Sequence, residues 1–304
     1  MRRKKRKANP VVATRLRASA LLEREDPMGF SVNTNSQAVL ALQSLGKTDR
    51  ELSAVQKRVS TGFRVADAKD DGGAFAAALA VRSDTAGLQA VNEQLGGIKG
   101  IVETTFASLG KVSDTMKELR QVVTRLADSS TNTEQRTQYN AQFTALTTQI
   151  GTFLDDAKYN GRSLLSTDTA AGGGNIDVLR NEDAQTFVLT ATDGAAVKTA
   201  LTVSGGFATA AAAATFLTTT FNTQEGAVAT ALNRYGTDLK YVENQITFNA
   251  DKIDSLNNGL GALVDADLAK ESAKLQALQV RQQLGIQTLG LANQGPQVLL
   301  SLFR

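Results

Sequence analysis

Cysteine, histidine and tryptophan do not occur in the 304-residue sequence, and only three prolines do. The absence of cysteine excludes disulfides, thiolate nucleophiles and cysteine-ligated metal clusters. The absence of histidine excludes His-based catalytic triads and zincin-type metal sites. Because proline interrupts helices, the proline-free stretch between Pro27 and Pro296 indicates long continuous helices.

The formal net charge of +3 is unevenly distributed along the chain. Residues 1–27 contain nine Lys and Arg residues but three acidic ones, so the remaining residues are net negative. Such a basic segment is able to bind nucleic acid or anionic lipid. It does not match a secretory signal, because Arg15 and Arg17 interrupt any apolar core. We interpret residues 1–27 as a basic disordered leader and Met28 as the true start.

Apolar residues that alternate at spacings of three and four predict packed helices. One such seam runs over residues 98–126 and another over residues 232–263, where Asn249 is a polar exception of the kind that fixes register in a coiled coil. A shorter run covers residues 139–153. Three apolar seams must bury one another, which predicts a mainly α fold: a long antiparallel helical bundle or coiled coil.

Polar residues at the helix boundaries are expected to cap helices. Thr131 and Glu134 have capping-box spacing at the start of the third run. The acidic pairs Asp70–Asp71, Asp155–Asp156 and Asp265 with Asp267 do not converge on one helix face. We therefore expect caps and solvated faces in place of an acid–base or metal site, and no enzyme and no cofactor.

The middle of the chain, residues 166–225, differs from its flanks. It is rich in Gly, Thr, Ala and Asp, and it predicts strands over 176–179 and 186–190 and a short helix over 208–221. Residues 199–224 carry no charge, but their threonines and few large apolar residues argue against a membrane span. The pattern predicts a small α+β insertion at the surface.

Looser apolar stripes mark both ends of the chain, and the last residues before Arg304 are strongly apolar. These stripes have no obvious partner within the bundle. Burial between molecules and docking back onto the bundle both account for them, and the residues alone leave the two alternatives open.

Several collinear motifs resemble those of bacterial flagellins. Residues 59–71 are similar to a segment near the start of that family, although Gly72 and Gly73 replace its usual alanines. Residues 158–165 resemble its Asn-Gly-x-x-Leu-Leu turn, and residues 265–271 and 292–303 resemble its terminal signatures. The resemblance covers most of the chain from Met28 onward and leaves the insertion unmatched.

The resemblance implies a division into domains. Residues 29–71 and 264–304 would form paired terminal helices, the filament core domain. Residues 72–165 and 226–263 would form a helical bundle domain, and residues 166–225 a variable insertion on the outside.

The resemblance also implies site residues of two kinds. The polymerisation interface would comprise Val39, Leu42, Leu45, Leu52, Val55, Leu268, Leu275, Leu278, Leu289, Pro296, Leu299, Leu302 and Phe303. The connector between domains would comprise Gly62, Arg64, Lys69, Asp70 and Asp71. Arg64 and the two aspartates are expected to order the connector electrostatically.

The implied function is that of a secreted structural subunit that polymerises into the flagellar filament for swimming. Its implied partners are further copies of itself, the flagellar type III export apparatus with an export chaperone, and the hook-associated junction and cap proteins. Nucleic acid and membrane insertion are not expected. Two alternatives stay open: a hook–filament junction protein of the same architecture, and a coiled-coil scaffold or nucleic-acid binder that uses the basic leader.

Overall fold

The computed structural model describes the backbone of residues 35–301 and the side chains as far as residue 294. The predicted leader over residues 1–27 and the proposed start at Met28 lie outside the described residues, as do Leu302 and Phe303. The chain divides into two compact units, with boundaries at Ala66/Asp67 and Asp265/Ala266. We call them the terminal unit, which contains both chain ends, and the central unit, Asp67–Asp265.

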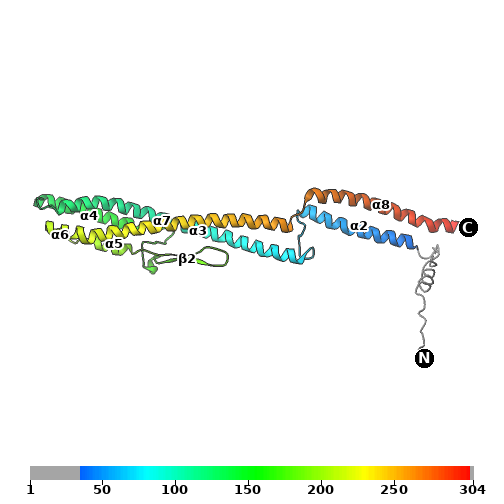
Figure 1. The fold of residues 1–304 in the computed structure, drawn as a ribbon, viewed down its shortest axis with the longest axis horizontal. Helices are drawn as coiled ribbons and strands as arrows, with labels where there is room; N and C mark the ends of the chain where they lie inside the picture. Colours follow the sequence, from blue (N-terminus) through cyan, green and yellow to red (C-terminus); the bar gives the residue numbers. More distant parts are fainter. Residues whose placement is uncertain (1–34, 302–304) are drawn as a thin grey trace, which may run out of the picture. The chain divides into compact units, whose positions relative to one another are not determined.

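The terminal unit is an antiparallel pair of helices, α2 (Ser36–Thr61) and α8 (Leu268–Ser301), which lie side by side (Figure 1). Asn35 begins α2 by accepting a hydrogen bond from the backbone N–H of Ala38, and its amide nitrogen donates to the carbonyl oxygen of Ala292 at 2.8 Å. At the other end Gly62 stops the helix, because its φ of 75° suits glycine far better than other residues. Polar side chains thus fix where α2 begins and how it pairs with α8.

Among the side chains that the structure describes, the apolar core of the terminal unit is small. Leu52, Val55 and Leu278 are buried, and Val59 and Leu275 pack against them half-buried. An ion pair joins α2 to α8 beside this core, with 3.5 Å between Arg58 Nη1 and Glu271 Oε1. So few buried side chains hold the two helices together only weakly, since stability rises with the apolar area removed from water.

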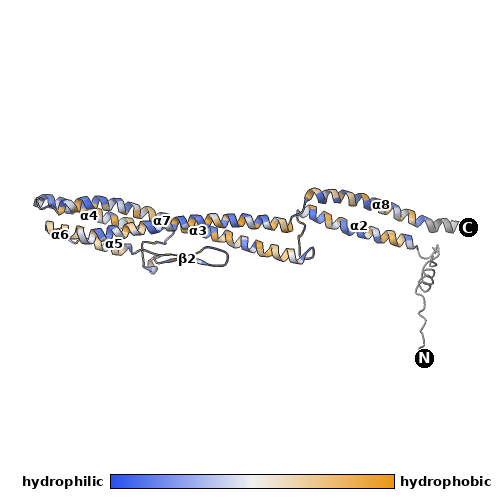
Figure 2. Ribbon diagram, in the orientation of Figure 1, coloured by the Kyte–Doolittle hydropathy of each residue, from blue (hydrophilic) through white to orange (hydrophobic). Residues whose placement is uncertain are grey.

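The central unit is built on two long antiparallel helices, α3 (Gly72–Leu126) and α7 (Asn222–Val264), with α4 (Thr133–Asp155) packed on α3. At a rise of 1.5 Å per residue, the 55 residues of α3 extend for about 80 Å. Hydrophobic and hydrophilic residues alternate along both helices (Figure 2), as packed seams require. The predicted mainly α fold with long packed helices is confirmed.

The segment between α4 and α7 folds against these helices. Its elements are the 3₁₀ turn η1 (Thr169–Ala171), β1 (Ile176–Leu179), β2 (Thr186–Leu189), α5 (Gly194–Leu201), α6 (Ala210–Phe216) and the π-helical turn η2 (Leu217–Phe221). The two strands form an antiparallel hairpin in which Ile176 pairs with Leu189. The strands agree with the sequence prediction within one residue. The short helix predicted over 208–221 is not separate, because α6 and η2 continue directly into α7.

Residues 166–225 contribute to the core of the central unit, which differs from the loop-like surface insertion that the composition predicts. Buried apolar residues from this segment join the same cluster as those of α3, α4 and α7: Ile176, Val178, Leu189, Val197, Leu201, Phe207, Ala213, Phe216 and Phe221. Phe207 and Phe216 meet Phe143 of α4 edge-on, with ring centroids 5.0 Å and 5.8 Å away. The composition of this segment, rich in glycine and threonine, does not predict these contacts, because its apolar residues are widely spaced in sequence.

The capping box at the start of α4 lies one residue later than predicted. Asn132, not Thr131, is the N-cap, and it exchanges hydrogen bonds with Gln135, not with Glu134. Asparagine is the better N-cap residue. The Thr131 hydroxyl instead donates to the carbonyl oxygen of Arg125, across the turn that joins α3 to α4.

Over residues 35–301, none of the helices has both the length and the apolar character that crossing a bilayer would take.

A buried tyrosine ties α7 to the segment before it. Tyr235 is fully buried, and its hydroxyl donates to the carbonyl oxygen of Leu164 at 2.8 Å and accepts from Arg234 Nη2 at 3.0 Å. Thr192 Oγ1 lies 2.9 Å from the same hydroxyl. One phenol therefore satisfies polar groups that are otherwise buried away from water.

Replacing this hydroxyl should destabilise the central unit. We expect Tyr235→Phe to lower the free energy of unfolding by about 1 to 3 kcal/mol, because it leaves buried polar groups unsatisfied. Urea unfolding followed by circular dichroism measures this change. The matched control is Tyr241→Phe, whose hydroxyl makes no hydrogen bond within the described residues and which should change stability by less than about 0.5 kcal/mol. Equal effects of the two substitutions would contradict the role of the Tyr235 hydroxyl.

Candidate functional site

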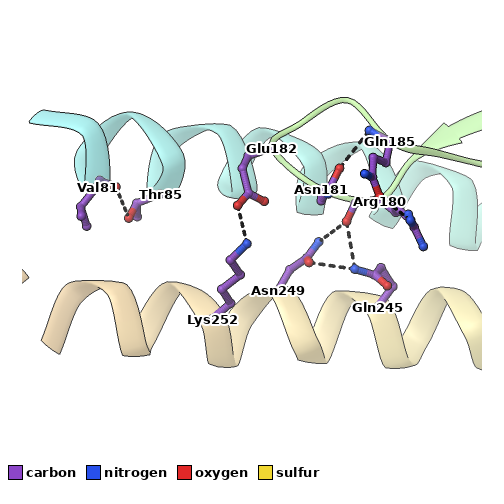
Figure 3. Close-up of polar contacts among 9 residues, drawn as sticks. All are labelled: Val81, Thr85, Arg180, Asn181, Glu182, Gln185, Gln245, Asn249 and Lys252. Carbon is purple, nitrogen blue, oxygen red and sulfur yellow. Dashed lines mark hydrogen bonds and ion pairs between the residues drawn. The ribbon is translucent and has the colours of Figure 1, made fainter. Parts of the chain in front are cut away.

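The polar exception in the α7 seam, Asn249, lies at the centre of a hydrogen-bonded cluster (Figure 3). Its side chain is fully buried, and its amide nitrogen donates to Asn92 Oδ1 of α3 at 3.0 Å and to the carbonyl oxygen of Arg180 at 3.2 Å. Gln245 Nε2 donates to Asn249 Oδ1 and to the same Arg180 oxygen, each at 2.9 Å. A slip of α7 along α3 would break these bonds, so Asn249 does what the sequence predicts of it.

The tip of the β1–β2 hairpin is held on α3 and α7 at the same place (Figure 3). Glu182 of the tip pairs with Lys252 of α7, and this hydrogen bond lowers the pKa of the Glu182 carboxyl. On the α3 side the tip approaches Gly87, where an added Cβ would lie 3.3 Å from the Cβ of Glu182. The hairpin is thus fastened to both long helices by its backbone, a charge and a close contact.

The five predicted connector residues lie at the boundary of the two units. Gly62 belongs to the end of α2, and its carbonyl oxygen accepts from the backbone N–H of Ala266 at 2.9 Å. Asp71 is the N-cap of α3 and accepts from the backbone N–H groups of Gly73 and Ala74, each at 3.0 Å. The Asp71 bonds are local bonds to backbone groups, which is how caps act, whereas the Gly62 bond joins segments far apart in sequence.

Asp70 and Lys69 shape the turn that precedes α3. The Asp70 carboxylate accepts from the backbone N–H of Asp67 at 3.3 Å, and Asp67 in turn accepts from the N–H of Lys69 at 2.9 Å. Carboxylates that accept from nearby backbone N–H groups fix Asx-type turns. An electrostatic role for Arg64 stays a prediction.

The predicted interface residues separate into two groups. Leu52, Val55 and Leu278 are buried between α2 and α8, and Leu275 packs half-buried beside them. Leu45 also faces α8, because an added Cβ at Gly285 would lie 3.2 Å from its Cδ1. Part of each end stripe is therefore buried against the other end of the same chain, which is neither of the two alternatives that the stripes alone leave open.

The second group faces solvent. Val39, Leu42 and Leu268 are exposed, with 61%, 59% and 49% of their surface accessible, and Leu289 is intermediate. Of Pro296 and Leu299 only the backbone is described, as part of α8. Where these residues meet a partner stays a prediction.

The structure also exposes apolar residues that the predicted interface does not include. They lie on the same two helices as the second group: Leu40, Val280, Leu284, Ile286 and Leu291. Ile286 and Leu291 belong to the apolar stripe that the sequence shows, but the stripe alone does not tell a paired side chain from an exposed one. A role for these exposed residues in an interface is a proposal.

No group of three or more acidic side chains within residues 35–301 is arranged to hold a metal ion.

Comparisons with known proteins decide the family. Residues 32–170 match the bacterial flagellin N-terminal helical region, and residues 222–303 match the bacterial flagellin C-terminal helical region. Flagellin FljM of Caulobacter vibrioides is 37% identical over 277 residues, which cover 90% of this chain and 98% of that protein. The chain belongs to the bacterial flagellin family. A flagellin of Brucella melitensis is 35% identical over 286 residues, covering 90% of this chain and 99% of its own.

Membership of the flagellin family sets the function. Flagellins are structural proteins, and this chain is accordingly a structural subunit that polymerises into a bacterial flagellar filament for motility. Neither the junction protein nor the nucleic-acid binder is favoured by these matches. The motifs at both ends of the sequence had pointed to the same family.

The stabilisation from the ion pair between Glu182 of the hairpin tip and Lys252 of α7 should depend on pH. Because the folded-state pKa of this carboxyl lies below its ordinary value of 4.5, its stabilising effect is complete above that value and is lost as the pH falls through the folded pKa. A double-mutant cycle of Glu182→Gln with Lys252→Met, measured by urea unfolding, should give a favourable coupling near neutral pH. The coupling should vanish once the pH has fallen below the folded-state pKa of Glu182. A coupling that is unchanged in acid would contradict the assignment.

Proposed function

We propose that this flagellin polymerises through the exposed apolar residues of α2 and α8. On α2 these are Val39, Leu40 and Leu42, and on α8 they are Leu268, Val280, Leu284, Ile286 and Leu291. The observation that carries the proposal is a contrast among the described side chains of the terminal unit: more large apolar side chains are exposed on these two helices than are buried between them. Contact with neighbouring subunits would remove them from water.

The buried residues of the predicted interface have a different role in this proposal. Leu52, Val55, Leu275 and Leu278 hold α2 against α8, and so give the exposed side chains a defined arrangement. Distinct patches on the two helices would meet different patches on the next subunit. Such head-to-tail contacts propagate as an open helical polymer. Pro296 and Leu299 of α8 belong to the proposed interface, as do Leu302 and Phe303, which lie outside the described residues.

The small core of the terminal unit supports a further proposal about export. A region with few buried apolar contacts opens locally at low cost in free energy. We propose that the chain passes the flagellar type III export apparatus unfolded, with the help of an export chaperone, and that it reaches the extracellular filament. There it would meet the hook-associated junction and cap proteins. We propose that the subunit has a structural role and no catalytic activity. The division into terminal helices, helical bundle and insertion, which the resemblance implies, is also part of the proposal.

Polar substitutions at exposed apolar positions of α8 should prevent polymerisation without unfolding the subunit. We expect Leu284→Ser combined with Ile286→Ser to abolish filaments in electron micrographs, because both side chains are more than half exposed in the single chain. The matched control is Gln283→Ser with Gln287→Ser, two exposed polar residues on the same turns of α8, which should polymerise normally. Normal filaments from the leucine and isoleucine variant would overturn the proposed surface.

The aspartates before α3 provide a separate test of the connector. Asp71→Ala removes the N-cap of α3 and should lower stability by about 1 kcal/mol. We expect Asp70→Ala with Asp71→Ala to impair filament assembly more than this loss of stability explains. Thr209→Ala, which removes the N-cap of the short helix α6, is the control for cap loss elsewhere. Intact assembly of the double aspartate variant would remove the connector role.

A further inference from the structure

A mainly apolar cavity of about 300 Å³ lies on the central unit and plays no part in the contacts described so far. Its walls are α3, β1 and the turn that follows α4. Ile98 and Ile101 line it from α3, Val178 and Leu179 from β1, and Tyr159 from the turn. An apolar cavity of about 150 Å³ suffices to bind benzene, so this one is large enough for an aromatic side chain.

The cavity wall is built by a close approach of the turn to α3. An added Cβ at Gly100 would lie 2.8 Å from Cζ of Tyr159, so only glycine at this position lets the tyrosine ring lie against the helix. The turn itself is fixed by paired backbone hydrogen bonds between Tyr159 and Arg162, at 2.9 Å and 3.0 Å. The cavity is therefore already formed in the single chain.

The same unit presents an aromatic side chain that its own chain does not bury. Phe248 of α7 is 60% exposed and does not line the cavity. Its neighbour Asn249 bonds to Asn92 of α3, two residues before Gln94 of the cavity. The exposed ring and the cavity thus lie at the same level along the paired helices.

Both features have charged neighbours. Arg162 and Asp177 line the cavity, and Asp251 and Lys252 follow Phe248 by three and four residues, which places them on neighbouring positions of the α7 surface. Lys252 is paired with Glu182, whereas neither Arg162 nor Asp251 has an ion-pair partner in the part of the chain that the structure describes. Opposite charges around an apolar contact fix its register and disfavour wrong partners.

We propose that Phe248 of one subunit inserts into this cavity of a neighbouring subunit in the filament, with Asp251 facing Arg162. The occupant is a second copy of this chain, because a projecting ring and a separate cavity form the pair of different patches that head-to-tail assembly needs. This inference rests on the proposed function. It adds a contact between central units to the contact between terminal helices.

Two substitutions test the contact from its two sides. Phe248→Ala removes the ring, and Gly97→Leu fills the cavity from α3, where an added Cβ meets no atom within 4 Å. Each should raise the critical concentration for filament growth from seeds about tenfold or more, with unchanged unfolding of the monomer. Thr247→Ala, on the adjacent exposed position of α7, is the control and should leave the critical concentration within about twofold.

The double variant decides whether the two residues act in one contact. Phe248→Ala with Gly97→Leu should be no worse than either single variant, because the same contact is lost once. If the increases in critical concentration of the two single variants multiplied in the double variant, the proposal would be overturned. It would also be overturned if Gly97→Leu raised the critical concentration and Phe248→Ala did not, because another segment would then fill the cavity. Normal growth of both single variants would overturn it as well.

A charge exchange provides an independent test. Arg162→Asp and Asp251→Arg should each raise the critical concentration, and the two together should restore it. If the double variant did not restore growth, the proposed contact between Asp251 and Arg162 would be wrong. The variant with Leu284→Ser and Ile286→Ser tests the proposed interface on α2 and α8 separately from the Phe248 contact. Its loss of filaments would support that interface whether or not Phe248→Ala changes the critical concentration.

Discussion

The burial of one long apolar seam, that of α3, organises the central unit. Leu88, Leu95, Val102 and Leu109 are almost completely buried along it, and α7 and α4 both pack against α3. A helix that long gains little from its own hydrogen bonds, and its stability comes from the packing of its apolar face. The hairpin, the cavity and the capped turn into α4 all take their positions from α3.

Within the described residues, the terminal unit buries no comparable seam. The same chain combines a central unit with an extensive core and a helix pair held by Leu52, Val55 and Leu278. A helix pair with a small core and exposed apolar residues gains most from a partner, because the partner supplies the missing burial. In the proposed assembly this asymmetry drives polymerisation, since contacts that were satisfied within the single chain would leave nothing to drive it.

Two glycines inside α3 allow other segments to pack closely against this helix. Gly87 and Gly100 lie inside α3, where each costs about 1 kcal/mol relative to alanine. Their positions coincide with the closest approaches of Glu182 and Tyr159. The missing side chains let the hairpin tip and the turn lie directly on the helix. The middle segment is in this way part of the packed unit.

The sequence by itself determined the helical seams, the polar role of Asn249, the two strands and, through motifs at both ends, the family. Periodicity carries this information because neighbouring positions on one helix face recur every three or four residues. It could not separate buried Leu52 from exposed Leu42, because both lie on one stripe and only the placement of α8 distinguishes them. Capping-box spacing predicts the α4 cap at Thr131, although Asn132 forms it. The cavity and the exposure of Phe248 depend on contacts between segments far apart in sequence, which only the tertiary structure decides.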